Sequence, residues 1–253
     1  MAAIKSWMSA NFLQLNDAKC EVLLLNTPQD TTLINNNLGP LLINSQPTVR
    51  NLGVVLDPNL SLESHVRKVV QTSFYHLRNI VKIKSFLSTP DLTKVIHAFI
   101  HSRLDYCNAL YSCLSKKLIH RLQLVQNAAA RLLTGSRKFD HITPILASLH
   151  WLPISYRIDF KIALITYKAL SGLAPSYISD LIDRYVPPRA LRSSAKGLLT
   201  VPTCNYVSRG KRAFAFRAPT LWNALPEEIR LANSLARFKT LLKTHLYRLA
   251  FNP

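Results

Sequence analysis

The spacing of apolar residues changes along the chain. Residues 4–15 have apolar positions near helical spacing, and the compact apolar run Cys20–Leu25 is typical of a buried strand. Short apolar segments at 31–34, 41–43 and 49–56, separated by turn-forming residues, predict further strands. The first 60 residues therefore predict one helix and a small antiparallel β meander. Because so small a sheet is only marginally stable alone, we interpret it as part of a larger domain.

From Leu60 onward the pattern becomes helical. Apolar residues at helical spacing predict helices over about 61–84, 89–111 and 115–135. The second begins at a Thr-Pro pair, which suits a cap followed by proline at the first helical position. Gly135 is placed to end the third. Three helices joined by short turns predict a bundle.

The remainder of the chain is also predicted to be mostly helical. A short helix is expected over 140–150, a long one over 154–170, and a final one over 235–251 with Ser234 as its cap. Residues 184–217 have an irregular pattern, and 219–229 are rich in turn formers. The predicted fold class is mainly α. The predicted domains are 1–60, a helical region 61–135, and a basic, mostly helical region 136–253.

Charge is distributed very unevenly. The chain has 32 Lys and Arg against 13 Asp and Glu, a formal net charge of +19. Residues 1–60 have a net charge of −1, residues 61–120 of +6, and residues 121–253 of +14. Since 48% of residues are hydrophobic, the chain can bury a core and is not a disordered basic tail. The charge predicts a polyanionic partner, with RNA or DNA favoured over a membrane.

The cellular location of the protein is predicted here from signals that the sequence does not contain. No apolar run approaches the roughly 20 residues of a membrane span, and the N-terminus lacks the pattern of a secretory signal. Four cysteines in 253 residues do not make a dense disulfide framework. We expect an intracellular protein, nuclear or cytoplasmic, that does not contact a membrane.

A series of motifs in one order resembles the reverse transcriptases of non-LTR, LINE-type retrotransposons. Leu13–Glu21 is similar to motif D, the segment just after the family's active site. Arg50–Asp57, with Leu60–Leu62 and His65-Val66, resembles motif E, the primer grip, and the start of the thumb. Further blocks resemble the thumb and C-terminal region of the jockey-like and chicken-repeat-like branch: Ser102–Asn108, Leu122–Arg131, His150–Ile154, Arg157-Ile158, Ala174–Tyr177, Arg212–Phe214, Ala218–Pro226 and Phe238-Lys239.

The resemblance implies RNA-directed DNA synthesis as the family's activity, and it also implies that this chain lacks the residues for it. The family copies RNA into DNA, using Mg²⁺ held by clustered carboxylates upstream of motif D. No Asp-Asp pair occurs in this sequence. We therefore expect the C-terminal part of such a polymerase: a nucleic-acid-binding fragment with no cofactor of its own, inactive alone. Two alternatives stay open. One is a pseudogene product with no working activity, and the other is a polymerase module complemented in trans by a separate palm domain.

Two candidate sites lie in the first 60 residues. By resemblance alone, Lys19 is a candidate general acid that protonates the leaving pyrophosphate; because this chain has no nucleotide site for it to serve, a solvated turn lysine is the favoured interpretation. Leu52, Gly53 and Val54 would form the primer-grip turn, where glycine lets backbone approach a nucleic-acid strand. The alternative is a bulge glycine in the meander.

Two basic segments are candidate nucleic-acid contacts. The first, on one predicted helix, comprises Arg67, Lys68, Arg78, Lys82 and Lys84. The second, within 184–217, has no acidic residue and includes Arg189, Arg192, Lys196, Arg209, Lys211, Arg212 and Arg217. Tyr185, Tyr206, Phe214 and Phe216 are interspersed with them, a pattern that suits stacking on unpaired bases. A solvated helix face and a loop anchored by its aromatics are the respective alternatives.

Metal and hydrolytic sites are not expected. His97 and His101 stand four residues apart, with Cys107, Cys113 and His120 downstream, but no Cys-x-x-Cys is present and the spacings do not match a zinc site. The nucleophile-elbow motif and the glycine-rich phosphate loop are absent as well.

Overall fold

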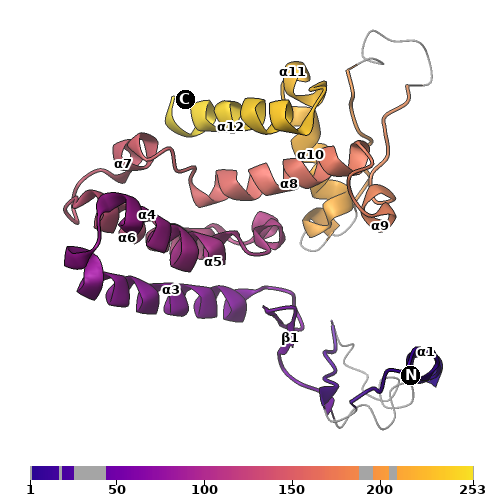
Figure 1. Cartoon of the computed structure of the whole chain (residues 1–253). Helices are drawn as coiled ribbons and strands as arrows, with labels where there is room; N and C mark the ends of the chain where they lie inside the picture. The colour runs from indigo at the N-terminus through magenta and orange to yellow at the C-terminus, as the bar shows by residue number, and fades with distance from the viewer. Residues whose placement is uncertain (1, 17–18, 26–43, 188–195, 205–209, 253) are drawn as a thin grey trace. The chain divides into compact units, whose positions relative to one another are not determined.

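The computed structural model describes residues 2–16, 19–25, 44–187, 196–204 and 210–252 (Figure 1). The chain divides into two units, residues 1–65 and residues 66–253, which are described separately. As predicted, the fold is mainly helical with one small antiparallel sheet. None of the helices in the described ranges combines the length and apolarity that a bilayer span requires.

The first unit contains a short helix and a hairpin. Helix α1 covers Ala2–Ala10, and strands β1 (Val49–Asn51) and β2 (Val54–Leu56) pair antiparallel. The single strand predicted over 49–56 is therefore wrong, because the chain reverses at Leu52-Gly53. Both turn residues have positive φ, 44° and 83°, the combination that a two-residue type I′ turn requires.

Of the other predicted strands, one is wrong and two lie outside the described residues. The run Cys20–Leu25 is not a strand: it makes an isolated parallel bridge from Val22 to Ser45. An apolar run forms a strand only where a neighbouring strand accepts its backbone hydrogen bonds, and among the described residues that run makes a single bridge. The strands predicted at 31–34 and 41–43 lie outside the described residues.

Helix α3 (Glu63–Ile83) confirms the predicted helix over 61–84. The turn before it is built on Asp57, whose carboxylate accepts backbone N–H groups of Asn59, Ser61 and Leu62 at 2.8–3.1 Å. Burial raises the pKa of Asp57, but these hydrogen bonds outweigh it and hold the pKa below its ordinary value. Ser61 Oγ accepts the amide of Glu63, so Ser61 rather than Ser64 serves the helix start.

The second predicted helix is more irregular than expected. It begins as α4 (Thr89–Ile96), with Ser88 as a side-chain cap, continues through a π-helical turn η4 (His97–His101), and ends with α5 (Ser102–Asp105). Cys107 then adopts a left-handed conformation with φ 51°, so the chain cannot continue helically to Tyr111. Two 3₁₀ segments flank this helix, η3 (Lys84–Phe86) and η5 (Asn108–Cys113).

The third predicted helix is confirmed as α6 (Lys116–Thr134). Ser115 accepts the amide of Leu118 at its start, and Gly135, at φ 71°, ends it in the left-handed conformation. Of its predicted apolar stripe, Leu118, Leu122, Val125 and Ala129 are buried, whereas Leu132 is half-buried; Ala130 is buried as well.

The C-terminal helices are α7 (Ile142–Ser148), α8 (Ile154–Leu170), α9 (Ser176–Ser179), α10 (Phe214–Ala224), α11 (Glu227–Arg230) and α12 (Leu235–Phe251), with a 3₁₀ turn η6 at Gly210–Arg212. Helices were predicted at α7, α8 and α12. The turn-rich prediction for 219–229 is wrong, because α10 continues through Pro219 and α11 follows. Burial of Ala218, Pro219 and Trp222 overrides the helix-breaking tendency of proline there.

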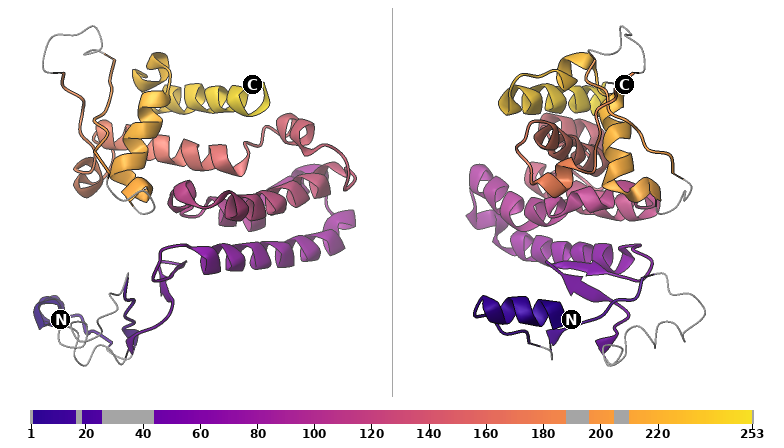
Figure 2. Two further views of the ribbon diagram at one scale, coloured as in Figure 1. Left: turned by 180° about the vertical axis from the view of Figure 1, so that it is seen from behind. Right: turned by 90° about the vertical axis from the view of Figure 1, so that its right-hand side faces the viewer.

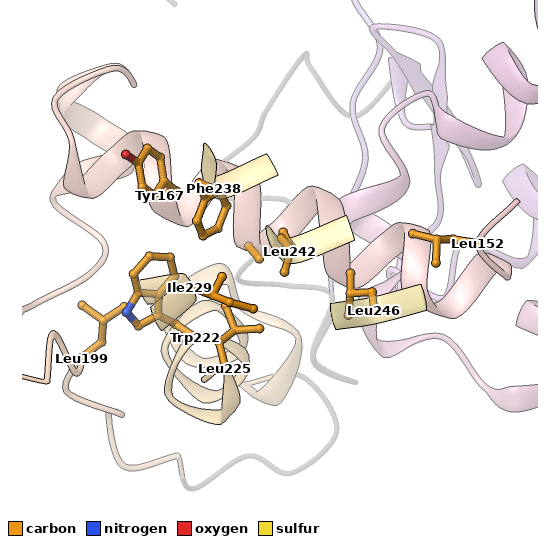
Figure 3. Close-up of a cluster of buried hydrophobic side chains, with 10 residues drawn as sticks. Leu152, Tyr167, Leu199, Trp222, Leu225, Ile229, Phe238, Leu242 and Leu246 are labelled. Carbon is orange, nitrogen blue, oxygen red and sulfur yellow. The ribbon is translucent and has the colours of Figure 1, made fainter. Parts of the chain in front are cut away.

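The core of the second unit lies among α8, α10, α11 and α12. Helix α12 runs alongside α8 in both orientations of the ribbon (Figure 2). Fully buried Phe238 stacks against Tyr167 at 4.3 Å between ring centroids and against Trp222 at 5.8 Å (Figure 3). Trp222 Nε1 donates to the carbonyl of Gly197 at 2.8 Å, so its one polar group is satisfied at the edge of the cluster. Helices from the predicted regions 61–135 and 136–253 also pack together, α6 on both α7 and α8.

Candidate nucleic-acid interface

Helix α3 has one buried and one basic face. Its buried residues are His65, Val66, Ser73, Leu77 and Ile80. Its exposed basic residues are Arg67, Lys68, Arg78 and Lys82, which we call the α3 stripe. At 1.5 Å per residue the stripe extends for about 22 Å along the helix. That is the length over which one strand of a duplex presents several phosphates.

The α3 stripe is not neutralised within the described part of the chain. None of its four bases has a carboxylate partner there, and the single acid of the helix, Glu63, stands in its first turn. Tyr75 shares the stripe's face and is 56% exposed, although it was not among the predicted site residues. Its position four residues after Gln71 and three before Arg78 is the signal that would have found it.

Lys84 differs from the four residues of the stripe. Its Nζ donates to the carbonyl of Leu132 at 2.7 Å, and the side chain is half-buried. Leu132 is in the last turn of α6, where carbonyl groups lack intrahelical donors. Lys84 therefore caps a neighbouring helix and does not share the exposed face on which it was predicted.

The second basic segment is described only in part. Arg189, Arg192, Arg209 and Tyr206 lie outside the described residues. Lys196, Lys211 and Arg212 are exposed, as is Tyr185, whereas Phe214 and Phe216 are half-buried in α10. For these two phenylalanines the structure therefore fits the alternative interpretation, in which aromatic residues anchor the segment to the protein.

Arg217 is engaged inside the protein. Its guanidinium donates to Asp159 Oδ1 at 2.7 Å, and both side chains are less than a third exposed. Burial raises the pKa of Asp159 and the adjacent guanidinium opposes that rise. Since the pair is internal, Arg217 contributes less to a phosphate-binding surface than its place in the segment predicted.

Lys19 and the hairpin lie close together in the first unit. Exposed Lys19 lines a surface hollow of about 440 Å³ with Glu21 and residues of β1, including Arg50. At the hairpin itself, Leu52 is 83% exposed and Val54 is buried. The predicted primer-grip residues therefore form a tight turn with an exposed tip, not a bulge.

In the second unit the exposed side chain of His97 meets the buried side chain of His101. Their Nδ1 atoms are 3.1 Å apart, and both rings contact the edge or face of Trp151. Burial, with help from Arg157 and His97, lowers the pKa of His101 to about 3, so it is neutral at pH 7. Cys107 is exposed, and the side chain of Cys113 lies outside the described part. The described ranges contain no group of three or more His, Cys, Asp or Glu residues that could hold a metal ion.

Several sequence motifs contact one another in the interior. Arg157 Nε donates to Asp105 Oδ1 at 2.8 Å, and a second guanidinium nitrogen donates to Oδ2. Buried Gln126 donates to the carbonyl of Leu152 at 2.9 Å, and Gln123 Oε1 accepts the amide of Ile154. These motifs are far apart in the sequence, so their polar residues hold α5, α6 and α8 together.

A cleft of about 470 Å³ beside this network was not predicted. Its lining comes from η4, α5, η5, α8, α12 and the segment before α8: His97, Asp105, Asn108, Leu149, His150, Trp151, Leu152, Arg157, Phe160, Lys161 and Lys243. Arg157 and Lys161, four residues apart on α8, were a signal available in the sequence. Lys243 on α12 is brought to them only by the tertiary packing.

Comparisons with protein-family models, with curated proteins and with solved structures each found no match. The class that the structure itself defines is a strongly basic, mainly helical protein with a small β hairpin.

Proposed function

We propose that this chain binds nucleic acid through the α3 stripe, as the thumb-like part of a non-LTR retrotransposon reverse transcriptase. The stripe would follow the phosphates of a template–primer duplex. Chemistry would require clustered carboxylates of the kind that this sequence lacks, so the proposed role of the chain is binding and positioning, not catalysis.

The observation that carries the proposal is the set of four exposed bases opposite a buried face, none of which has a carboxylate partner among the described residues. A protein side chain that neutralises a phosphate releases condensed counterions, and this release supplies affinity without reading sequence. Tyr75, exposed on the same face, adds a ring that can contact a sugar or a base. The order of the sequence motifs supports the polymerase part of the proposal.

The direct test is fluorescence anisotropy with an RNA–DNA primer–template, single-stranded RNA and duplex DNA. Four phosphate contacts predict that log affinity falls with log salt at a slope of about −3.6. Affinity for the primer–template should then weaken about 150-fold between 50 and 200 mM salt. An affinity that does not respond to salt, or binding seen only with aggregated protein, would contradict the proposal.

A pair of double variants locates the interface. Arg67→Gln with Arg78→Gln should reduce the steepness of the salt slope by about 1.8. Lys116→Gln with Lys117→Gln removes the same charge from exposed positions on α6 and serves as the control. Equal losses in the two variants would mean that net charge, and not the α3 stripe, determines binding.

A further inference from the structure

The cleft beside the Asp105–Arg157 pair has an unbalanced charge. Asp105 is the one carboxylate among the described residues that line it, and Arg157 already engages it with two hydrogen bonds. Lys161 and Lys243 remain, and neither has an ion-pair or hydrogen-bond partner in the described part of the chain. Two ammonium groups from different helices at one cleft favour an anionic ligand.

One polar atom in the cleft wall is buried without a donor. Asn108 is only 3% exposed, and its Oδ1 finds no hydrogen-bond partner among the described residues. Its amide nitrogen is directed to Asp105 Oδ1 at 3.4 Å, which orients the side chain. Because native proteins seldom leave a buried carbonyl oxygen unpaired, a ligand with a hydrogen-bond donor would fit there.

The same wall carries aromatic surface. Trp151 is 6% exposed and is held by edge contacts to His97 and His101, and Phe160 is half-buried on α8. The exposed ring of His150 lines the cleft as well. A planar, partly apolar ligand can pack against these aromatic side chains, whereas inorganic phosphate would make no contact with them.

We propose that this cleft binds one unpaired nucleotide. Its phosphate contacts Lys161 and Lys243, its base lies against Trp151 and Phe160, and a base N–H donates to Asn108 Oδ1. Each of these three requirements is met by a different part of a nucleotide. The inference rests on the proposed function in one respect: the nucleotide belongs to a strand whose duplex part lies on the α3 stripe.

Isothermal titration calorimetry of the full chain with adenosine 5′-monophosphate tests the cleft directly. Ribose 5-phosphate and adenosine separate the contributions of phosphate and base. The monophosphate should bind at least tenfold more tightly than either part. The double variant Lys161→Gln with Lys243→Gln should weaken the monophosphate at least tenfold and leave adenosine unchanged.

The chain supplies a closely matched control. Lys168→Gln with Lys239→Gln removes the same charge from the same two helices, with a half-buried lysine on α8 and an exposed one on α12 in both pairs. Neither control residue lines the cleft. Wild-type affinity in this variant supports the inference, and a loss equal to that of the cleft variant overturns it.

The remaining outcomes distinguish the two proposals. Salt-sensitive duplex binding without binding of the monophosphate overturns the cleft inference and leaves the proposed function standing. Ribose 5-phosphate that binds as tightly as the monophosphate also overturns it, because the site would then be a phosphate site. Monophosphate binding sensitive to the cleft variant, in a protein that binds no strand or duplex, supports the cleft and contradicts the proposed function.

Discussion

Two lysines at the end of α3 show how one turn of helix changes the role of a residue. Lys82 is exposed on the α3 stripe, whereas Lys84 points to the other side and donates to Leu132 at the end of α6. An ammonium at a helix C-terminus is stabilised both by the hydrogen bond and by the helix dipole. The same residue type thus serves binding at one position and stability at the other.

We predict opposite phenotypes for these two positions. Lys84→Met should lower the free energy of unfolding by about 1 kcal/mol, because the Leu132 carbonyl loses its donor, and should leave affinity for the primer–template unchanged. Lys82→Met should weaken affinity for the primer–template and leave the free energy of unfolding unchanged. Urea unfolding and anisotropy measure the two effects. A Lys84→Met protein that is as stable as the wild type but binds the primer–template weakly would show instead that Lys84 belongs to the interface.

At the scale of the element, caps and spacing account for most helices and fail at particular residues. Ser115, Gly135 and Ser234 begin or end helices as their residue types predict, whereas the cap of α4 is Ser88 and not Thr89 of the Thr-Pro pair. The π turn at His97–His101 and the left-handed Cys107 have no comparable signal, because both depend on how the segment packs against its neighbours. The hairpin was hidden for a different reason: a Leu-Gly turn inside an apolar run has the pattern of a continuous strand.

The hairpin makes a prediction about its two turn residues. Gly53→Ala should destabilise the hairpin by about 1 kcal/mol, since a Cβ is unfavourable at φ 83°. Leu52→Asn should stabilise it, because asparagine tolerates positive φ and Leu52 is exposed. Hydrogen exchange of the Asn51 and Val54 amides reports both changes. Faster exchange in Leu52→Asn would contradict the type I′ assignment.

At the scale of the whole molecule, charge and burial are unequally shared. In the described part of residues 1–65 the buried hydrophobic residues are Val54 and Leu62, whereas the aromatic cluster around Phe238 and most of the positive charge belong to residues 66–253. The second unit therefore dominates cooperative unfolding, and buried ionisable groups within it influence its response to pH.

Acid stability should depend on His101. The pKa of His101 is lowered from its ordinary value of 6.5 to about 3 in the folded protein. Between pH 6.5 and pH 3 the unfolded chain therefore binds a proton at His101 that the folded chain does not. Stability conferred above pH 6.5 is then lost as the pH falls toward 3, by at most about 1.4 kcal/mol per pH unit for this group. Arg157 and His97 are the neighbouring groups that add to the lowering of the His101 pKa, and Asp105 opposes the lowering of the His97 pKa.

The test compares slopes and not absolute stabilities. His101→Asn should flatten the dependence of unfolding free energy on pH between 6.5 and 3, even if the variant is less stable overall. His120→Asn, at an exposed position, is the control and should retain the wild-type slope. Identical slopes in both variants would show that other groups cause the acid sensitivity.

The sequence alone determined the class of the fold, the positions of most helices and the excess of positive charge. These follow from local rules: apolar spacing, capping residues and charge count act within a few residues of one another. The tertiary structure alone decided which bases face solvent, which, like Lys84 and Arg217, are used internally, and that Lys243 joins Arg157 and Lys161 at one cleft. Those outcomes depend on contacts between residues tens of positions apart, which no local pattern specifies.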